Sequence, residues 1–134
     1  MKKIKAEKKV LLNADIVKIW DTITDNTDYA WRSDLTEIRV ENELEFTEVD
    51  KSGIETEFEI IKKEPYQSYE FKLHNQNMKG RWRGVLEEKK DGTELSLNEE
   101  LEVGSWFLGL FAGGYVKRQQ NRYIKDLRKK IKQN

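Results

Sequence analysis

One carboxylate interrupts a run of apolar residues that recurs at strand spacing. Glu99 stands in the alternating series Leu95, Leu97, Glu99, Leu101 and Val103. Because side chains two residues apart on a strand point to the same face, the pattern turns Glu99 towards the apolar side of a sheet. Burial raises the pKa of a carboxyl group, so Glu99 is the best candidate for a general acid/base, or for an acceptor of hydrogen bonds from a ligand hydroxyl.

Structural roles compete with these chemical ones. A partner within the protein, such as Tyr69 or Gln119, would satisfy a buried Glu99, and a β-bulge would turn the carboxylate to solvent. Glu48 alternates in the same way beside Thr56, but its place near a strand end favours exposure. Glu99 is therefore the stronger of the two candidates for a buried functional carboxylate.

Other catalytic and metal chemistry has little support in the sequence. The chain contains no cysteine, which excludes thiolates and disulfides, and its single histidine argues against a histidine-based triad or a multi-histidine metal site. On the alternation through Phe71 and Leu73, that histidine, His74, points away from the core. Phosphate-binding glycine loops and nucleophile elbows are absent from the sequence. We therefore expect neither a metal nor a cofactor.

Aromatic side chains recur on the same predicted face as Glu99 and suggest a surface that binds an apolar molecule. Gly80 and Gly84 flank Trp82 and leave space beside it, although ordinary core packing is the alternative for each aromatic. On the last helix, Gln119 and Gln120 are almost equally well placed to supply a polar contact. The predicted ligand-binding residues are Trp31, Phe46, Phe58, Tyr69, Phe71, Trp82, Glu99, Trp106, Phe111, Tyr115 and Gln119.

Seven segments with a period of two must position these residues. They are 3–12, 35–41, 43–50, 54–64, 67–74, 78–89 and 93–103. Asn13 suits the N-cap of a short helix from Ala14, and residues 29–34 suit a second short helix or a turn. The first helix presents one apolar face, formed by Ile16, Ile19, Trp20 and Ile23.

Two turns predict how neighbouring strands pair. Residues 51–53 suit a three-residue hairpin, and Asp91-Gly92 suits a two-residue type I′ turn. The first pairs Phe46 with Phe58, Leu44 with Ile60 and Glu48 with Thr56, all on one face. The second pairs Leu86 with Leu97, Gly84 with Glu99, Trp82 with Leu101 and Gly80 with Val103, and on the other face Arg83 with Glu100 and Arg81 with Glu102.

The segment 104–116 carries no charge in a chain where 37% of residues are charged. Its thirteen residues are fewer than the ~20 that span a membrane, so we expect it to begin a long helix over 105–132. Gly109, Gly113 and Gly114 weaken this front half, where, together with residues 29–34, a cavity would open. The helix presents one stripe, formed by Leu108, Ala112, Val116, Gln119, Tyr123, Leu127 and Ile131.

We therefore predict one α+β domain over residues 1–134, with a seven-stranded curved antiparallel sheet around a long C-terminal helix and two short helices after the first strand. This order is that of the helix-grip fold. The sequence also resembles the START/Bet v 1-like (SRPBCC) superfamily, in particular its small bacterial polyketide cyclase/dehydrase-like group, over essentially the whole chain. The similar pieces are Asn13-Ala14, Ile19-Trp20-Asp21, Tyr29-Ala30-Trp31, the strand with Gly80 and Trp82, Asp91-Gly92-Thr93-Glu94-Leu95 and Tyr123-Ile124-Lys125-Asp126-Leu127.

The resemblance implies a cavity between sheet and helix that binds a lipid, a sterol or an aromatic polyketide, and it implies no catalytic motif common to the group. The leading hypothesis is a noncatalytic protein that binds a small hydrophobic molecule. A cyclase- or dehydratase-like enzyme is the first alternative, with Glu99 as acid/base and Tyr69 or Tyr115 as hydrogen-bond donor. Whether the protein is an enzyme stays open, with the balance towards binding alone.

Charge adds a third hypothesis. Overall, 25 basic side chains balance 25 acidic ones, so no general case for nucleic acid exists and we expect no DNA binding. Residues 117–132 hold eight basic side chains and one acidic side chain, which we interpret as a solvated helix face, with RNA, the ribosome or an anionic membrane as the alternative partner. Charges interrupt the N-terminal segment as far as Lys9, so we predict no signal peptide and a cytoplasmic protein, monomeric or dimeric.

Overall fold

Alternating side chains produce a seven-stranded antiparallel sheet in the computed structural model, which describes residues 2–104 and 114–132. The strands are β1 (Lys2–Leu12), β2 (Leu35–Val40), β3 (Glu45–Asp50), β4 (Glu55–Glu64), β5 (Ser68–His74), β6 (Met78–Lys89) and β7 (Gly92–Val103). Their order in the sheet is β1-β7-β6-β5-β4-β3-β2. The described helices are α1 (Ile16–Thr24) and α3 (Tyr115–Lys132).

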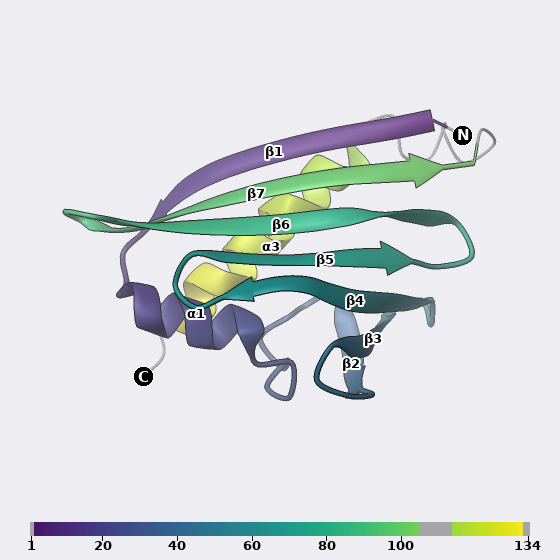
Figure 1. Cartoon of the computed structure of the whole chain (residues 1–134), viewed down its shortest axis with the longest axis horizontal. Helices are drawn as coiled ribbons and strands as arrows, with labels where there is room; N and C mark the ends of the chain where they lie inside the picture. The colour runs from purple at the N-terminus through teal and green to yellow at the C-terminus, as the bar shows by residue number, and fades with distance from the viewer. Residues whose placement is uncertain (1, 105–113, 133–134) are drawn as a thin grey trace.

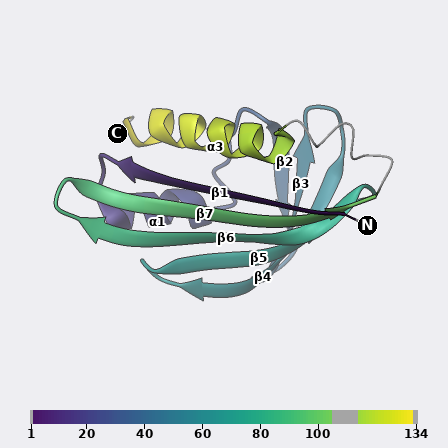
Figure 2. The same cartoon turned by 90° about the horizontal axis from the view of Figure 1, so that it is seen from above.

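The sheet curves around α3, which crosses behind it in Figure 1. Figure 2 shows the helix lying over one face, while β2 and β3 bend out of the plane of the other strands towards the helix side. Leu127 and Ile124 of α3 are buried against the apolar face of the sheet. The predicted α+β helix-grip fold is therefore confirmed. Neither of the two described helices is long and apolar enough to cross a membrane.

The helix after β1 begins two residues later than predicted. Asp15, and not Asn13, is its N-cap, because the Asp15 carboxylate accepts a hydrogen bond from the backbone N–H of Val17 at 2.7 Å. Ile19 and Trp20 are buried on the predicted face.

Residues 25–34 form a series of turns instead of the second short helix. A helix would require the backbone N–H of Ser33 to bond the carbonyl of Tyr29. That N–H instead donates to the Asp126 carboxylate of α3 at 2.8 Å, while Arg32 closes an isolated turn onto the Tyr29 carbonyl at 2.9 Å. A contact with a distant helix has thus replaced a local one.

The β3–β4 hairpin has the predicted register. Phe46 faces Phe58 and Glu48 faces Thr56. Directly before β3 begins, the carbonyl of Leu44 accepts a hydrogen bond from the N–H of Ile60 at 2.7 Å. The predicted pair is therefore present in the backbone, but Leu44 is 56% exposed and does not share the buried face.

The register predicted for the β6–β7 hairpin is wrong by two residues. Lys89 pairs with Gly92, so the turn is Lys90-Asp91, and Gly92, with φ of 143°, is the first residue of β7. A Cβ on Gly92 would come within 2.1 Å of the Leu12 carbonyl oxygen, which explains why glycine stands there. The true pairs are Leu86 with Leu95, Gly84 with Leu97, Trp82 with Glu99 and Gly80 with Leu101, and on the outer face Arg83 with Asn98 and Arg81 with Glu100. A shift of two leaves every side chain on its predicted face.

The last helix begins at Tyr115. Gly114, directly before it, has φ of 94°, which is left-handed, so a helix cannot run continuously through this residue as predicted. Trp106 and Phe111 lie outside the described residues, as does the rest of the segment 105–113.

Candidate ligand-binding cavity

A cavity of about 200 Å³ lies between the curved sheet and α3. Eight of the eleven predicted ligand-binding residues line it. These are Phe46, Phe58, Tyr69, Phe71, Trp82, Glu99, Tyr115 and Gln119. Trp31 is outside the lining: its ring packs against Tyr123 with 5.5 Å between centroids, and its Nε1–H donates to the Asp28 carbonyl at 3.1 Å.

A continuous wall of aromatic rings covers one side of the cavity. Phe46 stacks on Phe58 at 4.8 Å, and Phe71 stacks on Trp82 at 4.7 Å. The two stacks meet edge to face, with 4.9 Å between Phe58 and Phe71, and Tyr123 continues the wall onto α3 at 5.9 Å from Trp82. Each ring fixes its neighbours in favourable geometry, so the wall is preorganised for a flat apolar ligand.

The two glycines beside Trp82 provide packing space for the protein itself. A Cβ on Gly84 would lie 2.8 Å from the Trp82 ring, so that ring already covers the site. On Gly80, a Cβ would meet the Glu100 carbonyl oxygen at 2.1 Å and the Leu101 side chain at 2.7 Å. The prediction that these glycines leave open volume is therefore wrong, because neighbouring side chains and backbone fill it.

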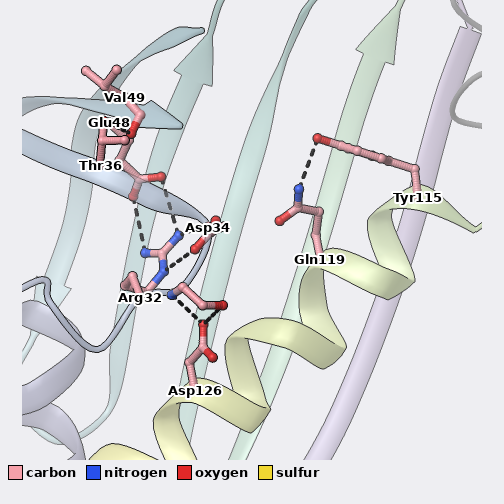
Figure 3. Close-up of polar contacts among 9 residues, drawn as sticks. Arg32, Asp34, Thr36, Glu48, Val49, Tyr115, Gln119 and Asp126 are labelled. Carbon is pink, nitrogen blue, oxygen red and sulfur yellow. Dashed lines mark hydrogen bonds and ion pairs between the residues drawn. The ribbon is translucent and has the colours of Figure 1, made fainter. Parts of the chain in front are cut away.

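The polar end of the cavity contains a largely buried ion-pair cluster that the sequence did not reveal (Figure 3). Arg32 binds Asp34 through Nε and Nη2, both at 3.2 Å, and Glu48 through Nη1 at 3.4 Å and Nη2 at 3.5 Å. The guanidinium also lies 5.1 Å from the ring centre of Tyr123. Burial alone would lower the pKa of Arg32, but Glu48 and Asp34 outweigh it and raise that pKa, so the group stays charged.

The cluster is attached to α3 through Asp126. The carboxylate of Asp126 accepts hydrogen bonds from the backbone N–H of Ser33 at 2.8 Å and from its hydroxyl at 2.7 Å. Figure 3 shows these bonds directly below Arg32. The turn that carries Arg32 is thereby fixed to the helix.

Glu48 is largely buried, contrary to the exposure expected near a strand end. Its side chain is only 14% exposed, because β3 turns it inwards and Arg32 reaches it from the preceding turn. Desolvation raises the pKa of Glu48, while the positive charge of Arg32 opposes the shift.

Glu99 faces the cavity from the centre of β7. It pairs with Ala6 of β1 on one side and with Trp82 of β6 on the other, so the strand is regular here and no bulge turns the carboxylate away. Desolvation raises the pKa of Glu99 to about 7, although a hydrogen bond from Gln120 lowers it; Glu48 adds to the rise and Arg32 opposes it. Glu99 is thus a group that exchanges protons near neutral pH.

Gln120, the neighbour of the predicted Gln119, holds Glu99 in place. It is 2% exposed, and its Nε2 also donates to the Ala6 carbonyl oxygen at 3.1 Å. Gln119 lines the cavity too, but its Nε2 donates to the Tyr115 hydroxyl at 3.0 Å, as Figure 3 shows. The sequence signal for Gln120 was present, because it stands at helical spacing in the buried series Val116, Gln120, Ile124, Leu127 and Ile131.

Three tyrosines, Tyr69, Tyr115 and Tyr123, line the cavity. Burial raises the pKa of Tyr69 and of Tyr123, so both phenols are neutral at physiological pH and can donate. The Tyr69 oxygen accepts a hydrogen bond from Asn26 at 3.3 Å. His74 lies on the outer face, as the alternation predicts, with its Nε2 at 2.6 Å from the Glu57 carboxylate. In residues 2–104 and 114–132 no three histidine, cysteine or acidic side chains are grouped to hold a metal ion.

This fold and site define a class: an antiparallel sheet that grips a C-terminal helix over an apolar cavity with a polar end. Solved structures share the fold. A START superfamily protein from Mycobacterium smegmatis has a TM-score of 0.83 and 14% sequence identity, and the match covers 96% of this chain and 97% of that protein. A conserved protein from Geobacillus kaustophilus has a TM-score of 0.84 and 14% sequence identity, and the match covers 96% of this chain and 95% of that protein. The di-domain ARO/CYC BexL from the BE-7585A biosynthetic pathway has 0.72 at 11% identity, over 98% of this chain and 51% of its own.

The chain belongs to the family described as polyketide cyclase/dehydrase and lipid transport, whose model matches residues 3–132. A search of the curated proteins found no match. Family and fold together support the binding of a hydrophobic ligand or a cyclase-like activity.

Proposed function

We propose that this protein binds a small hydrophobic molecule in the cavity between sheet and α3, without transforming it. The observation that carries the proposal is the combination of an aromatic wall with a cavity of about 200 Å³. An engineered apolar cavity of roughly 150 Å³ accommodates benzene, so a molecule of one or two rings fits the size. Stacking on Phe71 and Trp82 would supply apolar contact, and Glu99 would accept a hydrogen bond.

Contacts around the cavity favour one route of entry. The turn at residues 29–34 is tied to α3 through Asp126 and Ser33. Elsewhere the cavity is lined by Ile54 and Asn77, from two hairpin turns, and by Tyr115 at the start of the helix. An opening between these turns and the start of α3 would leave the contact of Asp126 with Ser33 intact, so we place entry there.

Ligand-dependent stabilisation tests the binding function. Delipidated protein should gain thermal stability from a member of a panel of sterols, fatty acids, naphthols and aromatic polyketides, because a ligand that binds only the folded state stabilises it. Native mass spectrometry of freshly purified protein would detect a molecule that copurifies.

Two tryptophan variants provide a matched comparison. Trp82→Ala removes a ring from the cavity wall and should reduce the stabilisation, whereas Trp31→Ala removes an equal ring outside the lining and should not. An equal loss in both variants, or no stabilisation by any member of the panel, would contradict the proposal.

The proton affinity of Glu99 favours a second candidate function, acid/base catalysis on an enolisable ligand. A carboxyl group with a pKa of about 7 beside a cavity can remove an α-proton and return one. Solvent-deuterium exchange into 2-tetralone, followed by NMR, would detect this chemistry. Glu99→Gln should abolish exchange and leave binding almost unchanged; exchange that persists in Glu99→Gln would exclude Glu99 as the base.

The outward face of α3 favours a third candidate, contact with a phosphate-rich polyanion. Seven basic residues of the helix are exposed, whereas its single acidic residue, Asp126, is turned inwards to Ser33. These are Lys117, Arg118, Arg122, Lys125, Arg128, Lys129 and Lys132. Cosedimentation with phosphatidylglycerol vesicles, and separately with ribosomes, should weaken steeply with salt and with Lys125→Glu. Binding whose strength does not change with salt concentration would contradict this function.

A further inference from the structure

Acidic side chains outnumber basic ones around the cavity. Its described lining holds four carboxylates and one guanidinium, with neither lysine nor histidine. The carboxylates belong to Asp34, Glu48, Asp50 and Glu99, and the guanidinium to Arg32. The sequence from 104 to 116 contains no charged residue, so the part of it outside the described residues cannot restore the balance.

The single cation is already engaged by the protein. Arg32 directs nitrogens to Asp34 and to Glu48, and only 14% of its side chain is exposed. A ligand carboxylate would therefore compete with Asp34 and Glu48 for the same guanidinium, and displacing either would leave a largely buried carboxylate without its cation. That exchange is costly, because an unpaired buried carboxylate loses its hydration without compensation.

Four of the five side-chain amides in the described lining, all except Asn77, are engaged in the same way. Four amide nitrogens each donate a hydrogen bond within the protein. Asn26 donates to the Tyr69 hydroxyl, Asn75 to the Thr56 hydroxyl, Gln119 to the Tyr115 hydroxyl and Gln120 to the Ala6 carbonyl. Gln120 also donates to Glu99, which has no paired cation among the described residues. Glu99 is therefore available to accept a hydrogen bond or an ion pair from a ligand, whereas Arg32 is already paired with two carboxylates.

We propose that the cavity selects ring compounds that bring hydrogen-bond donors, a primary amine above all and a hydroxyl next, and rejects the same skeleton with a carboxylate. This specificity rests on the proposed binding function. An ammonium group beside Glu99 supplies the cation that this carboxylate lacks, whereas an anion there faces Glu48 and Glu99 in a medium that screens poorly.

Three probes with one skeleton test the specificity: 2-naphthylmethylamine, 2-naphthylmethanol and 2-naphthoate, measured by isothermal titration calorimetry at about pH 8. We expect the amine to bind more tightly than the alcohol, and the carboxylate to bind at least about tenfold more weakly than the amine. Glu99→Gln should weaken the amine about fivefold or more and leave the alcohol unchanged. Glu100→Gln, on the outer face, is the matched control and should change neither.

The outcomes separate this specificity from the binding function itself. A carboxylate that binds as tightly as the amine overturns the specificity and leaves the binding function standing. An amine affinity that Glu99→Gln does not change overturns the role assigned to Glu99. Failure of all three probes to bind at millimolar concentration also overturns the specificity, whereas the binding function is decided separately by the ligand panel described above.

Discussion

Replacing Glu99 with glutamine should stabilise the protein at alkaline pH, although the residue faces the candidate site. In the folded protein burial raises the pKa of Glu99 from 4.5 to about 7. Each unit of difference corresponds to about 1.4 kcal/mol, which gives about 3 kcal/mol for complete ionisation. Because Glu99 is partly exposed to solvent, we expect a measured effect of about 2 kcal/mol.

The sign of the pH dependence follows from proton binding. Between about pH 4.5 and 7 the folded state keeps a proton that the unfolded chain has lost, so stability falls as the pH rises. The contribution of Glu99 is therefore fully present below about pH 4.5 and is lost as the pH passes through about 7. Glutamine cannot ionise, and the variant should escape this loss.

Urea unfolding at about pH 5 and about pH 8 measures the difference. The free energy of unfolding of Glu99→Gln should exceed that of the wild type by much more at the higher pH than at the lower, where only a small part of the Glu99 contribution has been lost. Glu100→Gln is the matched control, because the ion pair with Lys5 lowers the pKa of Glu100 and its removal cannot stabilise the protein at alkaline pH. A difference between Glu99→Gln and wild type that does not change with pH would refute the reasoning.

Three further outcomes follow from the buried contacts. Arg32→Met should lower the free energy of unfolding by about 3 to 5 kcal/mol in urea titrations, because two buried carboxylates lose their cation, whereas Arg39→Met at the surface should change it little. Asp126→Asn should speed amide exchange at Ser33, measured by NMR, because the charged acceptor is lost. Gly80→Ala should abolish folding, or lower the melting temperature sharply in calorimetry, because its Cβ would meet a backbone oxygen at 2.1 Å.

Face assignments could be predicted from sequence because they depend only on the period of a strand. The alternation around Glu99 predicted that its side chain lies on the inner face of the sheet. In the structure Glu99 does line the cavity, even though the predicted hairpin register was wrong by two residues. Gly92 was placed inside the turn, whereas the Leu12 carbonyl of the neighbouring β1 packs against it at the start of β7. Register depended on that contact with another strand, which the local sequence does not contain.

The ion-pair cluster shows the same limit more strongly. Arg32 and Glu48 are sixteen residues apart, and the turn that joins them to the cavity is held by Asp126, ninety-three residues after Ser33. No spacing rule connects such positions. The helical stripe likewise predicted an inward glutamine on α3 but not that Gln120, through its bonds to Ala6 and Glu99, would be the fully buried one.

The sequence by itself determined the order of the strands, the inward face around Glu99 and the presence of a carboxylate among apolar residues, because these follow from local periodicity. Tertiary structure alone decided what surrounds that carboxylate. Desolvation by the sheet and helix sets the proton affinity of Glu99, and packing brings Arg32 to Glu48. The charge balance of the cavity, on which its ligand specificity depends, therefore arises from distant segments that only the folded chain brings together.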